Sequence, residues 1–171
     1  MPHLFFALWS ALLLPTALSV EAPPAENVTF IPDTSPLWAF TPLDRWALVH
    51  AAGARAGTLH ETKWGGATAT LASPVNATLP SDAPTALGLL FGCGSSNGYA
   101  RVTVNGQVVA EALNTFTPGP ANYSHELRVP LNRSFFPNLP LWVLSFEATG
   151  RWQSGSKDSY VELQGVNVYF A

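Results

Sequence analysis

The feature that most constrains the fold is an alternation of apolar and polar residues with a period of two. In the stretch YARVTVNGQVV, which begins at Tyr99, Val102 and Val104 fall on one side of an extended chain and the polar residues between them on the other. Asn105-Gly106 follows at once, and this dipeptide favours the two-residue type I′ turn that joins antiparallel strands. An apolar segment resumes after the turn, so the stretch predicts a β-hairpin.

Other segments show the same period. TLHETKW and ATATLA flank Gly65-Gly66, which predicts a second hairpin. ALGLLFGCG is a continuous apolar run, which is typical of a strand buried on both faces. SYVELQGVNVYF changes its phase at Gly165, and a β-bulge there would keep one continuous inward face.

These patterns together predict the fold class. No amphipathic helical period of useful length follows the N-terminal segment, and prolines fall between the strands. Eight to ten short strands at regular spacing predict an all-β fold, an antiparallel β-sandwich or jelly roll. A chain of 171 residues suits one domain, which we expect to span residues 27–171.

An apolar run at the N-terminus predicts a targeting segment. LFFALWSALLL, residues 4–14, is shorter than the about 20 apolar residues of a membrane-spanning helix. Ala17 and Ser19 supply the small residues of a cleavage site, so residues 1–19 are predicted to be a signal peptide and residues 20–26 a flexible leader. The shortness of the run disfavours the alternative, an uncleaved anchor. We expect a protein secreted to the extracellular space or the cell wall, without a membrane span after signal cleavage.

Four N-x-[ST] sequons support this expectation of a secreted glycoprotein. Because a glycan cannot be buried, the asparagines of all four sequons are expected on surface loops. The predicted glycosylation sites are Asn27, Asn76, Asn122 and Asn132.

Charge and cysteine content limit the partners and the cross-links. The net charge is −3 and basic residues form no run, so no nucleic-acid partner is expected, because phosphate binding needs clustered Lys and Arg. The single cysteine, Cys93, cannot form an internal disulfide, so the core alone must stabilise the fold. Cys93 has two interpretations, a buried inert thiol, which its apolar neighbours favour, or an exposed thiol that pairs with a second chain.

A serine-hydrolase motif is present but lacks its structural context. GSSNG, residues 94–98, matches G-x-S-x-G, in which Ser96 would be the nucleophile. That nucleophile lies between a strand and a helix, whereas the residues after Ser96 predict a strand. We therefore predict no catalytic residue in this loop and a protein that is not an enzyme.

Carboxylates leave a glycan-active hydrolase open as a less favoured function, since most glycosidases use a pair of them. Those on or near predicted strands are Glu61, Glu111, Glu126, Glu147 and Glu162. Outward strand carboxylates are far more often solvated surface groups. No cofactor is predicted: the histidines lack zinc-binding spacing, and nothing singles out a structural calcium site, although aspartates with loop carbonyls could form one. Those aspartates are Asp33, Asp44 and Asp158.

Two tryptophans fit a ligand-binding role. Trp152 lies in the predicted polar loop GRWQSGSKDS, and Trp64 lies beside Gly65-Gly66. Exposed aromatic rings stack on sugar rings and sometimes mark binding sites. The alternative is that each of the two folds back and caps the end of the sandwich. The core is the predicted place of Trp38 and Trp46, by their apolar surroundings, and of Trp142, by its inward parity on its strand. Second-rank candidates for ligand contacts are Tyr99, Asn97, Arg151 and Gln153.

Four stretches together resemble a known group of proteins. DTSPLWAFTP, GTLHETKWGGATATL, ARVTVNGQVV and SYVELQGVNVYF occur in the order of the strands of galactose-binding-like jelly-roll ectodomains of secreted and membrane-anchored fungal proteins. The resemblance covers roughly residues 27–170. It implies a non-catalytic module, often taken to bind carbohydrate, and it supplies no binding residues.

The favoured function is therefore weak binding of an extracellular glycan or cell-wall polysaccharide through loop aromatics. The alternative from another class is an adhesive or structural extracellular protein that binds a protein partner through a sheet face.

Overall fold

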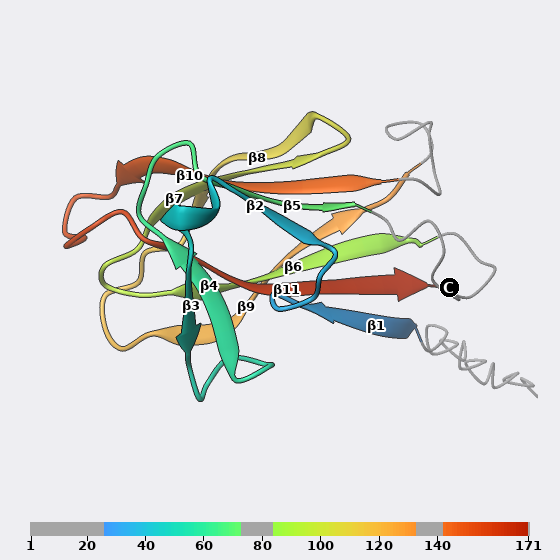
Figure 1. Ribbon diagram of the computed structural model, residues 1–171, viewed down its shortest axis with the longest axis horizontal. Helices are drawn as coiled ribbons and strands as arrows, with labels where there is room; N and C mark the ends of the chain where they lie inside the picture. The colour runs from blue at the N-terminus through green and yellow to red at the C-terminus, as the bar shows by residue number, and fades with distance from the viewer. Residues whose placement is uncertain (1–25, 73–83, 133–141, 171) are drawn as a thin grey trace, which may run out of the picture.

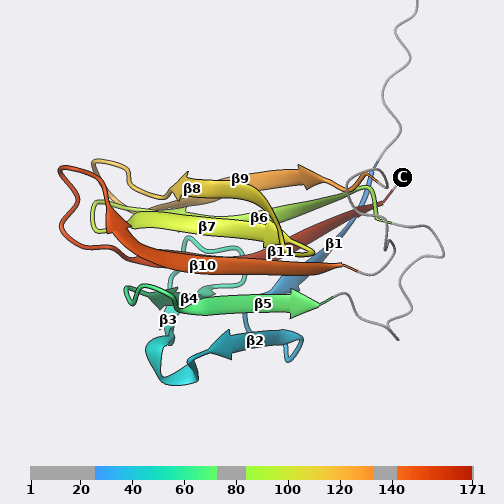
Figure 2. The same cartoon turned by 90° about the horizontal axis from the view of Figure 1, so that it is seen from above.

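The structure, a computed structural model, describes residues 26–72, 84–132 and 142–170. These residues form two antiparallel β-sheets that pack face to face (Figures 1 and 2). The first sheet contains β1 (Asn27–Pro32), β3 (Ala47–His50), β4 (Thr58–Thr62), β6 (Ala86–Cys93), β9 (Asn122–Pro130) and β11 (Val161–Phe170). The second contains β2 (Trp38–Thr41), β5 (Thr68–Ala72), β7 (Gly98–Val104), β8 (Gln107–Asn114) and β10 (Val143–Trp152). A short 3₁₀ helix, η1 (Leu43–Arg45), follows β2.

The strand order confirms the predicted antiparallel β-sandwich. It is β3-β4-β11-β6-β9 in the first sheet and β2-β5-β10-β7-β8 in the second. β1 and β4 share one edge of β11, because β4 pairs with residues 161–163 and β1 with residues 165–170. The described residues form eleven strands, more than the eight to ten expected, because β2 and β3 have only four residues each and show no clear period.

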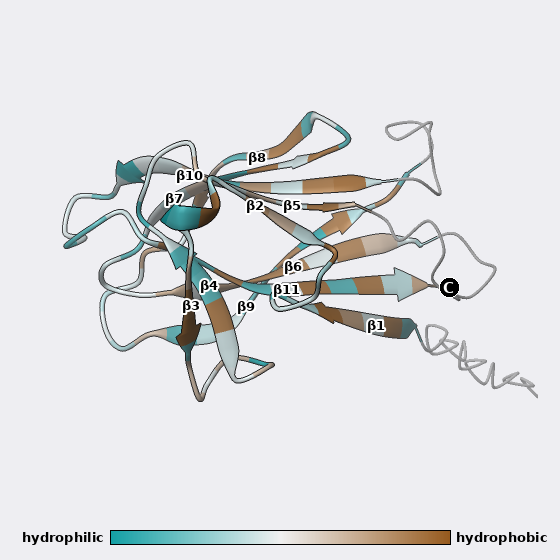
Figure 3. Cartoon of the chain, viewed as in Figure 1, coloured by the Kyte–Doolittle hydropathy of each residue, from teal (hydrophilic) through white to brown (hydrophobic). Residues whose placement is uncertain are grey.

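The core between the sheets is built from alternate residues of the strands. Leu144 and Phe146 on β10 have no exposed surface, while Ser145 between them is half-buried. The same alternation of hydrophobic and hydrophilic residues is visible along β11 (Figure 3). Trp38, Trp46 and Trp142 are all buried, which confirms their predicted place in the core.

Two local predictions from the sequence are confirmed. β7 and β8 pair through Asn105-Gly106, whose φ angles of 51° and 76° are those of a type I′ turn. The register of β11 against β6 shifts between Leu163 and Gly165, and Gly165 has a φ of 140°. A Cβ on Gly165 would meet the carbonyl oxygen of Ile31 on β1, so the close approach of β1 at this bulge requires glycine.

The hairpin predicted around Gly65-Gly66 is wrong. β4 pairs with β3 and β11 in the first sheet, whereas β5 pairs with β2 and β10 in the second. The connection between them therefore crosses from one layer to the other. The period of two shows which side chains of a strand share a face, but it does not determine which sheet the strand joins.

Some predictions fall on segments outside the described residues. These are the signal peptide at 1–19, nearly all of the leader, and the sequon at Asn76. Glu26, the last residue of the predicted leader, forms an ion pair with Arg128 on β9. Within the described ranges, no helix is long and apolar enough to cross a membrane.

Candidate functional site

The strands β4 and β10 finish at one end of the sandwich, on the left in Figure 1. This end carries a pocket of about 190 Å³. Its lining comes from η1 and the residues after it, from the end of β4, and from the residue before β11. The lining residues are Asp44, Arg45, Trp46, Ala47, Glu61, Thr62, Lys63, Trp64 and Tyr160.

Two aromatic rings of the pocket are each paired with a cation. Trp64 is 53% exposed, and the guanidinium carbon of Arg45 lies 5.4 Å from the centre of its ring. Lys63 Nζ lies 5.6 Å from the centre of the Tyr160 ring and 3.8 Å from the Asp158 carboxylate. Because a cation is attracted to the face of an aromatic ring, these pairs favour one orientation of each ring. About half of the Trp64 side chain nevertheless remains in solvent.

Glu61 connects the pocket to a buried carboxyl group. Glu61 on β4 and Glu162 on β11 are directly opposite in the register, so they lie on the same face of the first sheet. Glu162 is 9% exposed, and its Oε2 atom has no hydrogen-bond partner. Burial raises the pKa of both carboxyl groups. At Glu162, a hydrogen bond from Asn97 lowers the pKa and the charge of Glu61 raises it further.

Beyond Glu162, a hydrogen-bonded network covers this face of the sheet. Gln164 on β11 has no exposed surface. Its Oε1 accepts a hydrogen bond from the backbone N–H of Arg55 (3.1 Å), and its Nε2 donates to the carbonyl oxygen of Tyr123 (2.9 Å). Further along β11, Asn167 donates to Glu126 on β9 (3.0 Å). The loop around Arg55 and strand β9 therefore close the middle of the face, while Glu61 lines the end pocket.

The connection that carries Trp64 is fixed to the end of β10. The N–H of Gly66 donates to the carbonyl oxygen of Ala148 (2.8 Å). In return, the N–H of Ala148 donates to the carbonyl oxygen of Ala67 (2.9 Å). A Cβ on Gly150 would lie only 2.9 Å from the Cα of Gly65, so the two backbones touch where both residues lack a side chain.

The predicted ligand contacts gather toward this end of the sandwich. Trp152 is 62% exposed, but it is the last residue of β10 and not a loop residue as expected. Arg151 beside it is also exposed. Gln153 is half-buried and its Oε1 accepts a hydrogen bond from Asn114 (2.8 Å), so its amide has a partner within the protein.

Tyr99 and Asn97 are less accessible. Tyr99 is half-buried near the start of β7. Asn97 is 2% exposed, and its Nδ2 donates to the carbonyl oxygen of Gly92 (3.2 Å). Because it also interacts with Glu162, Asn97 holds the buried carboxyl group and presents little surface to a ligand.

The aspartates considered for calcium do not converge. Asp33 is fully buried and accepts hydrogen bonds from Thr58 (3.2 Å) and His60 Nδ1 (2.8 Å). Asp44 lines the end pocket, and Asp158 pairs with Lys63. Among the residues that the structure describes, no three His, Cys, Asp or Glu side chains form a group that could hold a metal ion.

The serine and the cysteine of the β6–β7 region lie in unreactive surroundings. Ser96 lies in the turn between two strands, β6 and β7, so this turn lacks the strand-to-helix context of a nucleophile elbow. Cys93 is buried, and burial together with the charge of Glu162 raises its pKa to about 11. The interpretation of a buried thiol is confirmed.

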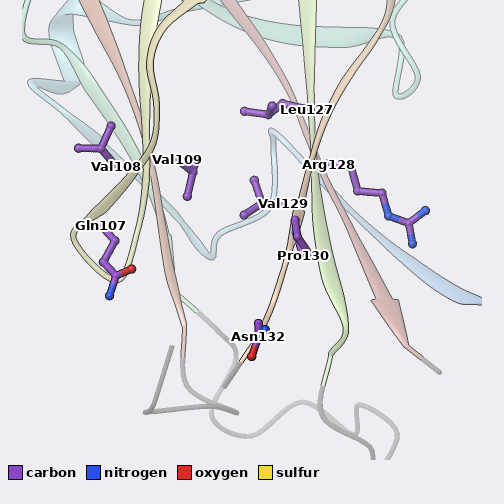
Figure 4. A pocket seen from close by; sticks show the side chains of 8 residues that line it. All are labelled: Gln107, Val108, Val109, Leu127, Arg128, Val129, Pro130 and Asn132. Atoms are coloured by element: carbon purple, nitrogen blue, oxygen red, sulfur yellow. The ribbon is translucent and has the colours of Figure 1, made fainter. Parts of the chain in front are cut away.

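A second cavity lies between the edge strands of the two sheets. It is a groove of about 440 Å³ between β8 and β9, and its walls are mainly apolar (Figure 4). Val109, Leu127 and Val129 point into it, with Gln107 and Asn132 at one end (Figure 4). Its described lining residues include neither an aromatic ring nor a carboxylate, the groups that usually bind a sugar.

Several residues of the end pocket were not predicted from the sequence to be ligand contacts. Arg45, Lys63 and Tyr160 are distant in sequence from one another, and no local pattern marks them. Glu61 was recognised only as one of several strand carboxylates. The contact between Gly65 and Gly150, which places the Trp64 connection against β10, has no signal in the local sequence.

Comparisons with known proteins identify the fold class of the chain but not its family. No protein-family model matches the chain, and no curated protein matches it. Solved structures that resemble it include β-sandwich carbohydrate-binding modules and carbohydrate-active enzymes. The fold implied by the resemblance is therefore confirmed, while membership of the fungal family stays a prediction.

Three of these structures show the extent of the likeness. A family 35 carbohydrate-binding module from Clostridium thermocellum has a TM-score of 0.52 and 14% identity, over 85% of this chain and 99% of that chain. The xylan-binding module CBM15 has a TM-score of 0.52 and 9% identity, over 86% and 98%. A xanthan lyase from Paenibacillus has a TM-score of 0.51 and 12% identity over 83% of this chain, which spans only 12% of that enzyme. At these identities the likeness shows the fold alone.

Proposed function

We propose that the protein is a secreted, non-catalytic module that binds a carbohydrate at the end pocket beside Trp64. The observation that carries the proposal is an indole ring that is half exposed at the rim of a pocket lined by charged side chains. An apolar surface with a few converging polar groups is the usual form of a ligand site.

The pocket has the groups that sugar recognition needs. The exposed part of Trp64 offers a flat apolar surface to the C–H face of a pyranose ring. Asp44 and Glu61 can accept hydrogen bonds from hydroxyl groups, and Lys63 can donate them. The solved modules of similar fold, one of them xylan-binding, support the assignment to a binding module.

The position of Glu162 argues against Glu61 and Glu162 as the catalytic pair of a glycosidase. A pair of catalytic carboxyl groups must both reach the bond that is cleaved. Glu61 lines the pocket, but Glu162 behind it is 9% exposed and its unpartnered oxygen lies over Gly92, on the far side of β11 from Glu61. The two carboxyl groups are therefore not presented together to a bound sugar.

Secretion belongs to the same proposal. It is supported by the N-terminal apolar run and by the sequons, of which Asn27, Asn122 and Asn132 are exposed in the structure. The expectation that all the sequon asparagines lie on loops is wrong for Asn27 and Asn122, which are the first residues of β1 and β9. A glycan on any of these three would extend into solvent without displacing the core.

Retention on insoluble polymers tests the binding function. The mature protein would be incubated with chitin, cellulose, xylan and β-glucan, and the bound fraction compared with that of Trp64→Ala. Leu48→Ala on β3 is a matched control, since Leu48 is also 53% exposed and apolar. We expect retention on at least one polymer, at least tenfold weaker in Trp64→Ala and unchanged in Leu48→Ala. Equal retention of wild type and Trp64→Ala would remove the end pocket from the proposal.

An adhesive protein makes a different prediction for the same sample. It would self-associate in size-exclusion chromatography or capture a protein partner without competition from free sugar. Absence of retention on every polymer, combined with such association, would replace the carbohydrate assignment.

A further inference from the structure

Trp64 and Trp152 are exposed to a degree that is unusual for tryptophan. Their exposed fractions are 53% and 62%, whereas the other described tryptophans, Trp38, Trp46 and Trp142, are at most 8% exposed. Large aromatic side chains in solvent that group on one part of a surface are a common mark of binding sites. Trp152 does not line the end pocket, so it is not part of the Trp64 site as described.

The backbone sets an upper limit on the separation of the Cα atoms of these two tryptophans. Trp64 precedes Gly65, Gly65 touches Gly150, and Trp152 is two residues further along β10. One Cα–Cα step, one contact between neighbouring strands and two more Cα–Cα steps add to at most about 16 Å. The hydrogen bonds of Ala148 to the Trp64 connection hold that separation constant.

The size of the pocket indicates how much of a ligand it can enclose. Its volume of about 190 Å³ is below the range of about 300–1,000 Å³ that encloses a whole small-molecule ligand. A bound sugar chain must therefore extend beyond the pocket. Trp152 is an exposed aromatic residue whose Cα lies at most about 16 Å from that of Trp64. Arg151 beside it is an exposed hydrogen-bond donor.

We propose that Trp64 and Trp152 are two subsites for one extended glycan chain, so that the ligand class is a linear oligosaccharide or polysaccharide and not a terminal monosaccharide. The inference rests on the proposed carbohydrate-binding function. Trp64 with the end pocket holds one sugar residue, and Trp152 stacks on another residue of the same chain. Two linked contacts bind together more tightly than either alone, because the second contact is intramolecular.

Binding as a function of chain length tests this inference. The probes are xylo-, cello-, chito- and β-1,3-gluco-oligosaccharides of one to six units, titrated by calorimetry into wild type, Trp64→Ala and Trp152→Ala. For the series that binds, we expect the wild-type affinity to rise at least tenfold from the shortest to the longest member. Trp152→Ala should abolish the rise and keep the affinity for the shortest ligand, whereas Trp64→Ala should weaken binding at every length.

A matched control separates the subsite from general effects on β10. Val143→Ala changes an exposed apolar residue, 42% exposed, at the other end of the same strand. It should retain the wild-type dependence on length. Thermal unfolding of all variants should be within a few degrees of wild type, since both tryptophans are largely in solvent.

The outcomes distinguish this inference from the proposed function. Affinity that does not grow with length, or a rise that persists in Trp152→Ala, would overturn the two-subsite inference and leave the carbohydrate-binding function intact. Absence of binding to all four series and to the insoluble polymers would overturn both.

Discussion

Replacing Glu162 with glutamine is expected to stabilise the protein at neutral pH. The Oε2 atom of this buried carboxyl group has no hydrogen-bond partner, and Glu61 lies opposite on the neighbouring strand. A buried carboxylate with one unpartnered oxygen costs free energy even though Asn97 hydrogen-bonds the group, and like charges directly opposite on two strands add to that cost. The amide keeps the shape of the side chain and removes the charge.

The size of the effect follows from the charge, because the amide still places a polar atom at the position of Oε2. Leaving a buried polar group unsatisfied costs about 1–3 kcal/mol, and more when the group is charged, so removing the charge should raise the free energy of unfolding by about 1 kcal/mol at pH 7. For a domain of this size each kcal/mol corresponds to about 2–4 °C in Tm. Thermal unfolding at pH 7, followed by circular dichroism, measures the change.

The pH dependence of the effect has a definite sign. Because burial raises the pKa of Glu162, the folded protein holds this proton more tightly than the unfolded chain. The stability contributed by the bound proton is therefore complete below the ordinary carboxyl pKa and is lost as the pH rises through the raised value. The advantage of Glu162→Gln should consequently vanish at pH values below the ordinary carboxyl pKa and grow toward neutral pH.

Glu126 provides a matched control on the same face. Its carboxylate lies over Gly88 as that of Glu162 lies over Gly92, but its Oε1 accepts hydrogen bonds from Tyr169 (2.6 Å) and Asn167 (3.0 Å). Glu126→Gln should therefore leave the protein equally or less stable. A Glu162→Gln variant that is less stable than wild type at pH 7, or whose gain does not depend on pH, would refute the reasoning.

Three further experiments have expected outcomes. Gly165→Ala should destabilise the protein by several kcal/mol in urea unfolding, since its Cβ would meet the Ile31 carbonyl at a left-handed φ; a loss below 0.5 kcal/mol would contradict this. Phe146→Ala in the core should cost about 3–5 kcal/mol in the same assay, whereas Leu48→Ala on the surface should cost less than about 0.5. Cys93, with a pKa of about 11, should react with a disulfide reagent at pH 8 much more slowly when folded than in denaturant; equal rates would show an accessible thiol.

The local parts of the fold could be predicted from the sequence, because short-range chemistry determines them. Asn105-Gly106 specified a turn that no other nearby dipeptide offers, and the change of phase at Gly165 located the bulge. The crossing from β4 to β5 could not be predicted, because the side-chain period is the same for two strands of one hairpin and for strands in opposite sheets.

The same limit applies to the candidate site. Trp64 and Trp152 were identified because their local sequence offers no apolar partners. The pocket beside Trp64 was not, because Arg45, Glu61 and Tyr160 come together only through contacts between distant strands. The sequence predicted Asn97 as a ligand contact in its loop, whereas the structure buries it against Gly92 and the Glu162 carboxyl group.

The pairing of β1 with β11 has a consequence for how the molecule can be attached to a surface. Asn27 pairs with Phe170, so the two ends of the folded domain leave it side by side. β11 begins near the pocket, where Val161 pairs with the last residue of β4, and runs for ten residues, or about 33 Å, to those ends. A tether at either terminus is therefore attached to the end of the domain away from the pocket, and we expect immobilised protein to keep the proposed carbohydrate site accessible whichever end carries the tether.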